Sequence, residues 1–301
     1  MSNTFEKRLI SSKLDMEMQG LFRTRKLLDT AQIKYNFSYN DYLSLTNDAK
    51  VNSFYQKAFQ KYPTGSTGSM LLSGYNQAQA DLENKLAADL SVDACVLFSS
   101  GYMANLSVVS LLSAFAAHLL IDKSVHASIY DGIKMANADY TRFLHNDLLS
   151  LKNKFQSMRE FANIAIITES IFSMSGQIAD LAQMHMLVQD SRSSLIVDEA
   201  HAFGVVGERG LGGVIGAGLT QEDVPLRIIP LGKAVAGCGA IVAGKGIWIE
   251  SLLQMRSAIY TTAHSPAFAY GLLETINYLQ TLDLRREKLQ ELIAYFRKMI
   301  I

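Results

Sequence analysis

Short runs of apolar residues alternate with longer amphipathic stretches along most of the 301-residue chain. The apolar runs cover residues 94–98, 118–121, 164–167, 195–197 and 227–229. Continuous apolar runs are typical of strands buried on both faces, and helices between such strands connect parallel neighbours. The pattern therefore predicts an α/β fold of three layers, in which helices cover both faces of a mostly parallel sheet.

The two ends of the chain follow other patterns. Apolar residues recur at helical spacing over residues 5–28, which predicts an amphipathic helix, and residues 35–38 read as a short strand. After Ala243 the pattern is helical up to the apolar Met299-Ile300-Ile301. Because an end on apolar residues in mid-helix is unusual, we expect a truncated chain.

Composition and charge narrow the classes of partner. Hydrophobic residues make up 49% of the chain and the formal net charge is +0, so nothing favours nucleic acid or an anionic membrane surface. No apolar segment is long enough to span a membrane, and the polar N-terminus lacks the apolar core of a signal peptide. Cys95 and Cys238 lack metal-ligand spacing. We therefore expect free thiols, a cytoplasmic protein and small-molecule partners.

Residues 195–201, Leu-Ile-Val-Asp-Glu-Ala-His, place two carboxylates and an imidazole at the end of a buried strand. A nucleotide hydrolase would need an earlier phosphate-binding loop, but the nearest match follows at residues 239–246 and has Gly246 at the metal-binding position. Zinc would need more ligands near Asp198 and His201, and a solvated acidic turn is a third alternative. The fourth is pyridoxal 5′-phosphate (PLP), because a strand-end carboxylate such as Asp198 keeps a pyridine nitrogen protonated.

Three further features fit a PLP site. Lys233 follows the next apolar run, and the small apolar residues at 234–240 would lower the pKa of its amine and make it a nucleophile. Residues 99–102, Ser-Ser-Gly-Tyr, open a helical stretch where backbone N–H groups could bind phosphate. His126 begins another helical stretch after a strand. Each feature also has an ordinary structural alternative. Lys233 could be a solvated cap, residues 99–102 an ordinary turn, and His126 a packed or capping histidine.

In chain order these strings resemble the α-oxoamine synthases, fold-type I PLP enzymes that condense an amino acid with an acyl thioester and lose CO₂. The matching strings span nearly the whole chain, at residues 36–43, 73–75, 99–105, 126–128, 145–147, 168–174, 197–201 and 231–233. The biotin-pathway branch is the most similar, which implies L-alanine and a pimeloyl thioester of CoA or a carrier protein as substrates. Branches that use glycine or serine stay open, since nothing fixes the acyl chain.

The resemblance implies a role at the cofactor ring for five residues. Lys233 would form the Schiff base, and Asp198 would pair with the pyridine nitrogen. His126 would stack on the ring face, beside the substrate. Ser173 and His201 would contact the ring oxygen.

Five other residues would hold the phosphate or the substrate. The resemblance implies that Gly101 and Tyr102 present backbone to the phosphate and that Arg23 holds a substrate carboxylate. Thr261 and Thr262 match a segment that reaches the phosphate of the neighbouring subunit. A homodimer with shared active sites is therefore implied. The resemblance implies no metal ion at the site.

The resemblance also implies a division into domains. Residues 1–45 would form an N-terminal helical arm and small-domain segment, and residues 46–275 the PLP-binding large domain. Residues 276–301 would begin a C-terminal small domain that is largely missing.

Three departures from the family pattern affect the expected activity. Pro230 replaces a Thr or Ser whose hydroxyl binds the phosphate, and proline offers neither hydroxyl nor N–H. Leu71 and Gln79 replace histidines that follow a Gly/Ser-rich loop at residues 65–74. A later family arginine for the substrate carboxylate has no counterpart here. We expect weaker PLP binding and an impaired synthase; a non-catalytic remnant that pairs with a full-length synthase is the alternative.

Overall fold

The computed structural model describes residues 4–28 and 33–300 and divides into two units, residues 1–39 and 40–301. The first unit contains helix α1 (Thr4–Met18), so the helix predicted over residues 5–28 is confirmed to Met18 and wrong beyond it. Gly20, at φ +67°, ends the helix by donating its N–H to the carbonyl of Glu17.

The strand predicted at residues 35–38 is wrong, since these residues form no strand. The side chain of Asn36 accepts the backbone N–H of Ser38 at 2.8 Å. Such a local bond from an asparagine to the backbone two residues on turns the chain and competes with an extended conformation.

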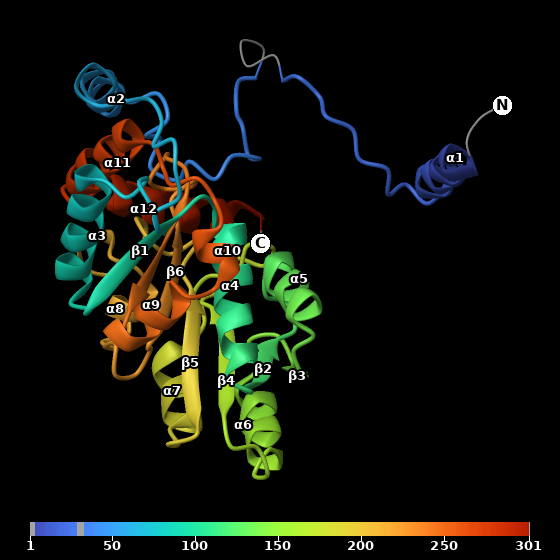
Figure 1. The fold of residues 1–301 in the computed structure, drawn as a ribbon. Coiled ribbons are helices and arrows are strands. Elements are labelled where there is room, and N and C mark those ends of the chain that lie inside the picture. Colours follow the sequence, from blue (N-terminus) through green and yellow to red (C-terminus); the bar gives the residue numbers. More distant parts are fainter. Residues whose placement is uncertain (1–3, 29–32, 301) are drawn as a thin grey trace. The chain divides into compact units, whose positions relative to one another are not determined.

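The second unit is built on a seven-stranded sheet with the order β1-β7-β6-β5-β4-β2-β3 (Figure 1). Its strands are β1 (Ala94–Phe98), β2 (His118–Asp122), β3 (Tyr140–Phe143), β4 (Ile164–Glu169), β5 (Ser193–Asp198), β6 (Leu226–Pro230) and β7 (Ala240–Gly244). Strand β7 runs antiparallel to both of its neighbours, while the other pairs are parallel. Every strand predicted from a buried apolar run is present; β3 and β7 were not predicted.

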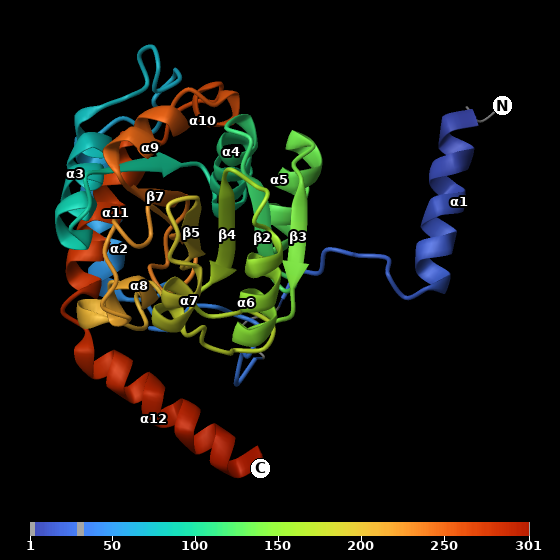
Figure 2. The same ribbon diagram turned by 90° about the horizontal axis from the view of Figure 1, so that it is seen from below.

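Helices cover both faces of this sheet (Figure 2). On one face pack α4 (Gly101–Ala114), α5 (Ala127–Ala136), α9 (Gly246–Leu252) and α10 (Arg256–Ile259). On the other face pack α2 (Ala49–Lys61), α3 (Gln77–Leu90), α6 (Leu148–Ser157), α7 (Leu181–Val188), α8 (Gly213–Gly216) and α11 (Pro266–Leu279). The short helix η2 (Glu208–Gly210) and the long α12 (Asp283–Ile300) complete the unit.

Alternate residues of the strands face these two layers. On β4, Ala165 and Ile167 belong to the core under α4, whereas Ile164 and Ile166 belong to the core under α6 and α7. Such strands are apolar on both sides, as a parallel sheet between two helical layers requires. The predicted three-layer α/β fold is confirmed.

The parallel strands deliver polar side chains to one edge of the sheet. Glu169 and Asp198 are the last residues of β4 and β5 and lie opposite each other in register. Pro230 ends β6, next to β5. Because the carboxyl ends of parallel strands share an edge, loops and helix N-termini converge there, and ligands usually bind at such edges. No helix within residues 4–28 and 33–300 is both long and apolar enough to cross a membrane.

Candidate active site

Asp198 is buried at the carboxyl end of β5, with only 2% of its surface exposed. Its carboxylate accepts hydrogen bonds from Asn105 Nδ2 and from the backbone N–H of Ala200, both at 2.9 Å. Burial raises the pKa of Asp198, while those two donors and the charges of Lys233 and His126 act to lower it. Asp198 therefore lies in one electrostatic environment with the predicted lysine and histidine.

Lys233 lies in the loop after β6, with its Nζ 2.8 Å from Nε2 of His201. Burial lowers the pKa of the Lys233 amine, against the opposing charges of Asp198 and Glu169. The desolvation predicted from the small neighbours is confirmed, since Ala234 is buried beside it. A lowered pKa increases the share of neutral, nucleophilic amine.

His201 completes the group at the β5 end and is 8% exposed. Burial, and then the charges of Lys233 and His126, lower the pKa of His201 to about 4. The imidazole is therefore neutral at neutral pH, with one nitrogen that donates and one that accepts a hydrogen bond. Its Nδ1 lies 2.6 Å from the hydroxyl of Tyr42, a residue to which the sequence analysis gave no role.

His126 is the N-cap of α5, as one of the sequence alternatives had it. Its Nδ1 accepts the backbone N–H of Ser128 at 3.2 Å and lies 2.7 Å from the Ser128 hydroxyl. The same hydroxyl accepts a hydrogen bond from Asn105, which also binds Asp198. Asn105, also without an assigned role before, thus links the predicted stacking histidine to the predicted ring carboxylate.

Glu169 is a further carboxyl group that the sequence analysis did not single out. It is 2% exposed, and its Oε1 has no hydrogen-bond partner among the described residues. Burial and then the charge of Asp198 raise the pKa of Glu169 to about 8, against the backbone amides of His126 and Ser173 and the charge of Lys233. Its signal was the same as that of Asp198, a carboxylate that ends a buried strand.

The residues predicted to bind an anion lie at the start of α4, and that role stays a prediction. Gly101 is the first residue of the helix, and a Cβ there would lie 2.7 Å from Cγ of Pro230. The close approach therefore requires glycine, and it brings the end of β6 against the first turn of α4. The first backbone N–H groups of a helix lack intrahelical acceptors and bind anions. The side chain of Tyr102 has a separate partner, since its hydroxyl donates to Asp131 at 2.5 Å.

Thr261 and Thr262 lie in the segment between α10 and α11. The next residue, Ala263, donates its N–H to the carbonyl of Gly68 at 2.8 Å. His264 then lies with Nε2 3.1 Å from the carbonyl oxygen of the last residue of β1. The segment thus passes the Gly/Ser-rich loop and the approach to α4 within its own chain. Its reach to a neighbouring subunit stays a prediction.

The remaining predicted residues are less connected. Ser173 is exposed in the loop after β4, and Arg23 lies in the first unit; the roles of both stay predictions. Gln79 is buried at the start of α3, where its side-chain amide lies 2.7 Å from that of Asn76. Leu71, by contrast, is 62% exposed.

The second carboxylate of the Asp198-Glu199 pair belongs to a different cluster. Glu199 Oε1 lies 2.7 Å from Nη2 of Arg227, and both side chains are buried. Glu199 also accepts the backbone N–H groups of Gly213 and Val214, at 2.5 and 3.2 Å. This ion pair stabilises the segment that enters α8.

The other chemistries that the sequence left open find no support here. Residues 240–244, inside the match to a phosphate-binding loop, form strand β7. Across the described part of the chain no three His, Cys, Asp or Glu side chains come close enough to hold a metal ion. Cys95 and Cys238 are both free thiols.

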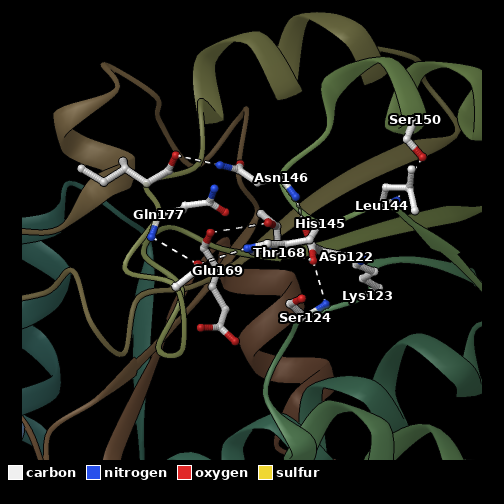
Figure 3. A network of polar contacts seen from close by, with 12 residues as sticks. Asp122, Lys123, Ser124, Leu144, His145, Asn146, Ser150, Thr168, Glu169 and Gln177 are labelled. Carbon is white, nitrogen blue, oxygen red and sulfur yellow. Dashed lines mark hydrogen bonds and ion pairs between the residues drawn. The ribbon is translucent and has the colours of Figure 1, made fainter. Parts of the chain in front are cut away.

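A second polar network lies at the end of β2 (Figure 3). Buried Asp122 accepts the backbone N–H groups of Ser124 and Asn146 at 2.7 Å and lies 3.1 Å from Nδ1 of His145. The other ring nitrogen of His145 lies 3.1 Å from the hydroxyl of Ser175. Figure 3 shows the Glu169 side chain extending away from this network. Asp122 and His145 together therefore join the loops that follow β2, β3 and β4.

The fold is similar to those of solved structures. A serine palmitoyltransferase from S. paucimobilis with a bound PLP–myriocin aldimine is similar with a TM-score of 0.85 at 25% identity, over 96% of this chain and 76% of that chain. An 8-amino-7-oxononanoate synthase from Francisella tularensis is similar with a TM-score of 0.77 at 32% identity, over 87% and 74%.

Sequence relatives point the same way. An 8-amino-7-oxononanoate synthase from Thioalkalivibrio sulfidiphilus is 35% identical over 93% of this chain and 74% of that protein. One from Saccharophagus degradans is 40% identical over 87% of this chain and 66% of that protein. The chain thus spans about two thirds to three quarters of their length. Residues 32–300 match the family described as aminotransferase class I and II. The chain therefore belongs to the aminotransferase class I and II family, and within it to the α-oxoamine synthase type.

Proposed function

We propose that this chain is a PLP-dependent acyltransferase of biotin biosynthesis. It condenses L-alanine with pimeloyl-CoA or pimeloyl carrier protein, with loss of CO₂, to give 8-amino-7-oxononanoate. The observation that carries the proposal is that a desolvated amine, Lys233, and the buried carboxylate of Asp198 lie close enough at one end of the sheet for each charge to affect the pKa of the other group. The names of the relatives that are 35% and 40% identical support the choice of reaction.

The residues at this edge fit PLP by their chemistry. A lowered amine pKa suits the Schiff base, the first turn of α4 suits the phosphate, and a buried carboxylate suits the pyridine nitrogen. When bound, the cofactor supplies an electron sink for the carbanion that forms at the amino-acid α-carbon. The proposed ring contacts of His126, Ser173 and His201 complete the fit.

Proton handling falls to three side chains. Lys233 Nζ would be the base that takes the substrate α-proton and returns one at the end, and its lowered pKa increases the share of neutral amine for that role. Asp198 has to be charged to keep a ring nitrogen protonated. Asn105, together with the backbone of Ala200, favours that charge by donating to its carboxylate.

The proposal extends to substrate and subunit contacts. Arg23 holds the substrate carboxylate, and Thr261 and Thr262 reach the phosphate of the neighbouring subunit in a cytoplasmic homodimer with shared sites. The division into an arm at residues 1–45, a large domain at 46–275 and the start of a small domain at 276–301 is part of the same proposal.

The test is a substrate matrix with purified protein and added PLP. Alanine, glycine and serine are each combined with pimeloyl and long-chain acyl thioesters, and alanine with pimeloyl thioester is expected to give product. Lys233→Ala is the matched control, and it should lose both the product and the visible imine absorbance. Preference for glycine or serine would move the chain to another branch, whereas an imine without any product would favour a non-catalytic remnant.

A further inference from the structure

A series of hydrogen bonds leads from the half-buried amine of Lys233 to the protein surface. Lys233 Nζ lies 2.8 Å from His201 Nε2, and His201 Nδ1 lies 2.6 Å from the hydroxyl of Tyr42. That hydroxyl lies in turn 3.1 Å from Oδ1 of Asn40, which is exposed. All four residues belong to the second unit.

The chemistry of Asn40, the last residue in this series of hydrogen bonds, decides which group donates and which accepts in each of them. Asn40 Oδ1 can only accept a hydrogen bond, and a tyrosine hydroxyl has a single proton. Both contacts of Tyr42 can be hydrogen bonds at once only when its hydroxyl donates to Asn40 and accepts from His201 Nδ1. A neutral imidazole then has its lone pair on Nε2, toward Lys233.

We propose that Tyr42 is a positioning residue that holds His201 as the Nδ1–H tautomer, so that Nε2 accepts a hydrogen bond from Lys233 Nζ. The inference deepens the proposed function, because Lys233 carries that function. It concerns the orientation of a hydrogen-bond donor and acceptor in the protein without a cofactor.

The backbone around Tyr42 is held firmly enough for such a role. The neighbouring Asp41 accepts the backbone N–H groups of Leu45 and Thr46 at 2.8 and 3.1 Å. On the other side, Leu43 is 2% exposed and its carbonyl accepts from Arg285 at 3.0 Å. Tyr42 therefore lies between two anchored residues, and its hydroxyl keeps one place relative to His201.

Lys233 can impose the same tautomer on His201 as Tyr42 does. A charged lysine can only donate, so it would impose a free lone pair on Nε2 without any help from Tyr42. The charge of Lys233 depends in turn on Asp198 and Glu169, whose charges favour it. A test of Tyr42 therefore has to remove the lysine.

The experiment measures the tautomer of His201 by ¹⁵N NMR in Lys233→Met protein without cofactor, with a His201→Gln variant to assign its signals among the six histidines. With Tyr42 present, Nδ1 is expected to carry the proton. In Lys233→Met/Tyr42→Phe the proton should move to Nε2 in most molecules, because Nδ1–H has lost its acceptor. Tyr295→Phe, an exposed site on α12, is the matched control and should change nothing.

Asn40→Ala tests the hydrogen bonding of the Tyr42 hydroxyl without changing the packing of the Tyr42 ring. This variant keeps the Tyr42 ring but frees its hydroxyl to donate to Nδ1, so Nε2–H should again increase. Asn40 is exposed, so the variant is expected to fold even if Tyr42→Phe does not. An Nε2–H tautomer with Tyr42 and Asn40 both present, or no change in either variant, would overturn the proposal. Absence of an imine with PLP would instead overturn the proposed function, since the NMR result needs no cofactor.

Discussion

Two buried charged clusters begin at adjacent residues of one strand end, and their charges are balanced in different ways. Glu199 forms an ion pair with the guanidinium of Arg227, whose Nε donates a hydrogen bond to it, and it also accepts two backbone N–H groups. Within the described residues, Asp198 has only the neutral donors Asn105 and Ala200, and Oε1 of nearby Glu169 has no partner.

This difference distinguishes a cluster that stabilises the fold from a cluster that can take part in catalysis. A buried ion pair whose hydrogen-bonding capacity is filled holds a fold together and has nothing left for a ligand. The Asp198 cluster combines raised carboxyl pKa values with a lowered amine pKa, the combination that active sites use. Substitutions on the Glu199 side should therefore affect stability, and those on the Asp198 side activity.

The largest expected effect is on stability. Arg227→Met leaves Glu199 buried without its cation and should lower the free energy of unfolding by about 3–5 kcal/mol, measured by urea denaturation. The double variant Glu199→Gln/Arg227→Met, which removes both charges, should recover part of that loss. A loss below about 1 kcal/mol for the single variant would remove the distinction between the two clusters.

Asp198→Asn, in the other cluster, should lower activity rather than stability. Without a carboxylate the ring nitrogen is not kept protonated, so kcat should fall about 100-fold or more, which corresponds to about 2.7 kcal/mol of activation free energy. Stability should be unchanged or higher, since no charge is then buried. Retention of activity by this variant would refute the role of Asp198.

The pH dependence of stability sharpens the comparison further. An unperturbed glutamic acid has a pKa of about 4.3, whereas the pKa of Glu169 in the folded chain is about 8. Between these values the folded chain keeps a proton that the unfolded chain has released. Stability should therefore fall as the pH rises through this window, by at most about 1.4 kcal/mol per unit.

Glu169→Gln should flatten that slope, as followed by urea unfolding at several pH values. Glu250→Gln, at an exposed position, is the control and should leave the slope as it is. An equal slope in the Glu169 variant and the wild type would show that this carboxyl group ionises without cost in the folded chain.

The smallest effect concerns the phosphate site. Pro230→Ser adds a hydroxyl beside the first turn of α4, and one more hydrogen bond to a charged group should tighten PLP binding by roughly tenfold. Pro230→Ala isolates the hydroxyl, because it removes the ring without adding a donor on the side chain. Titration of PLP absorbance against the three proteins gives the dissociation constants; equal values for Ser and Ala would refute this reading of the proline.

The strands that have continuous apolar runs could be predicted from the sequence. The two strands that were not predicted, β3 and β7, lack such a clear signal. Strand β3 lies at the sheet edge and buries only Phe143 fully, so it has no continuous apolar run. Strand β7 is buried but rich in small residues, Ala-Ile-Val-Ala-Gly, and glycine-flanked runs of this kind are also typical of loops.

The candidate site shows a similar limit. Residues that follow a buried strand, such as Asp198 and Lys233, could be predicted because strand ends converge. Asn105 and Tyr42 could not, since their partners lie 93 and 159 residues away in the chain and only the fold brings them together. The roles that the resemblance implies for Arg23 and other substrate-binding residues stay predictions.

The central claim is that Lys233 is the amine that binds the cofactor, and one measurement tests it most directly. The protein is mixed with PLP, reduced with borohydride so that any Schiff base becomes permanent, digested, and mapped by mass spectrometry. The account predicts a single dominant pyridoxyl group, on Lys233. Labelling spread over exposed lysines, or none at all, would contradict it.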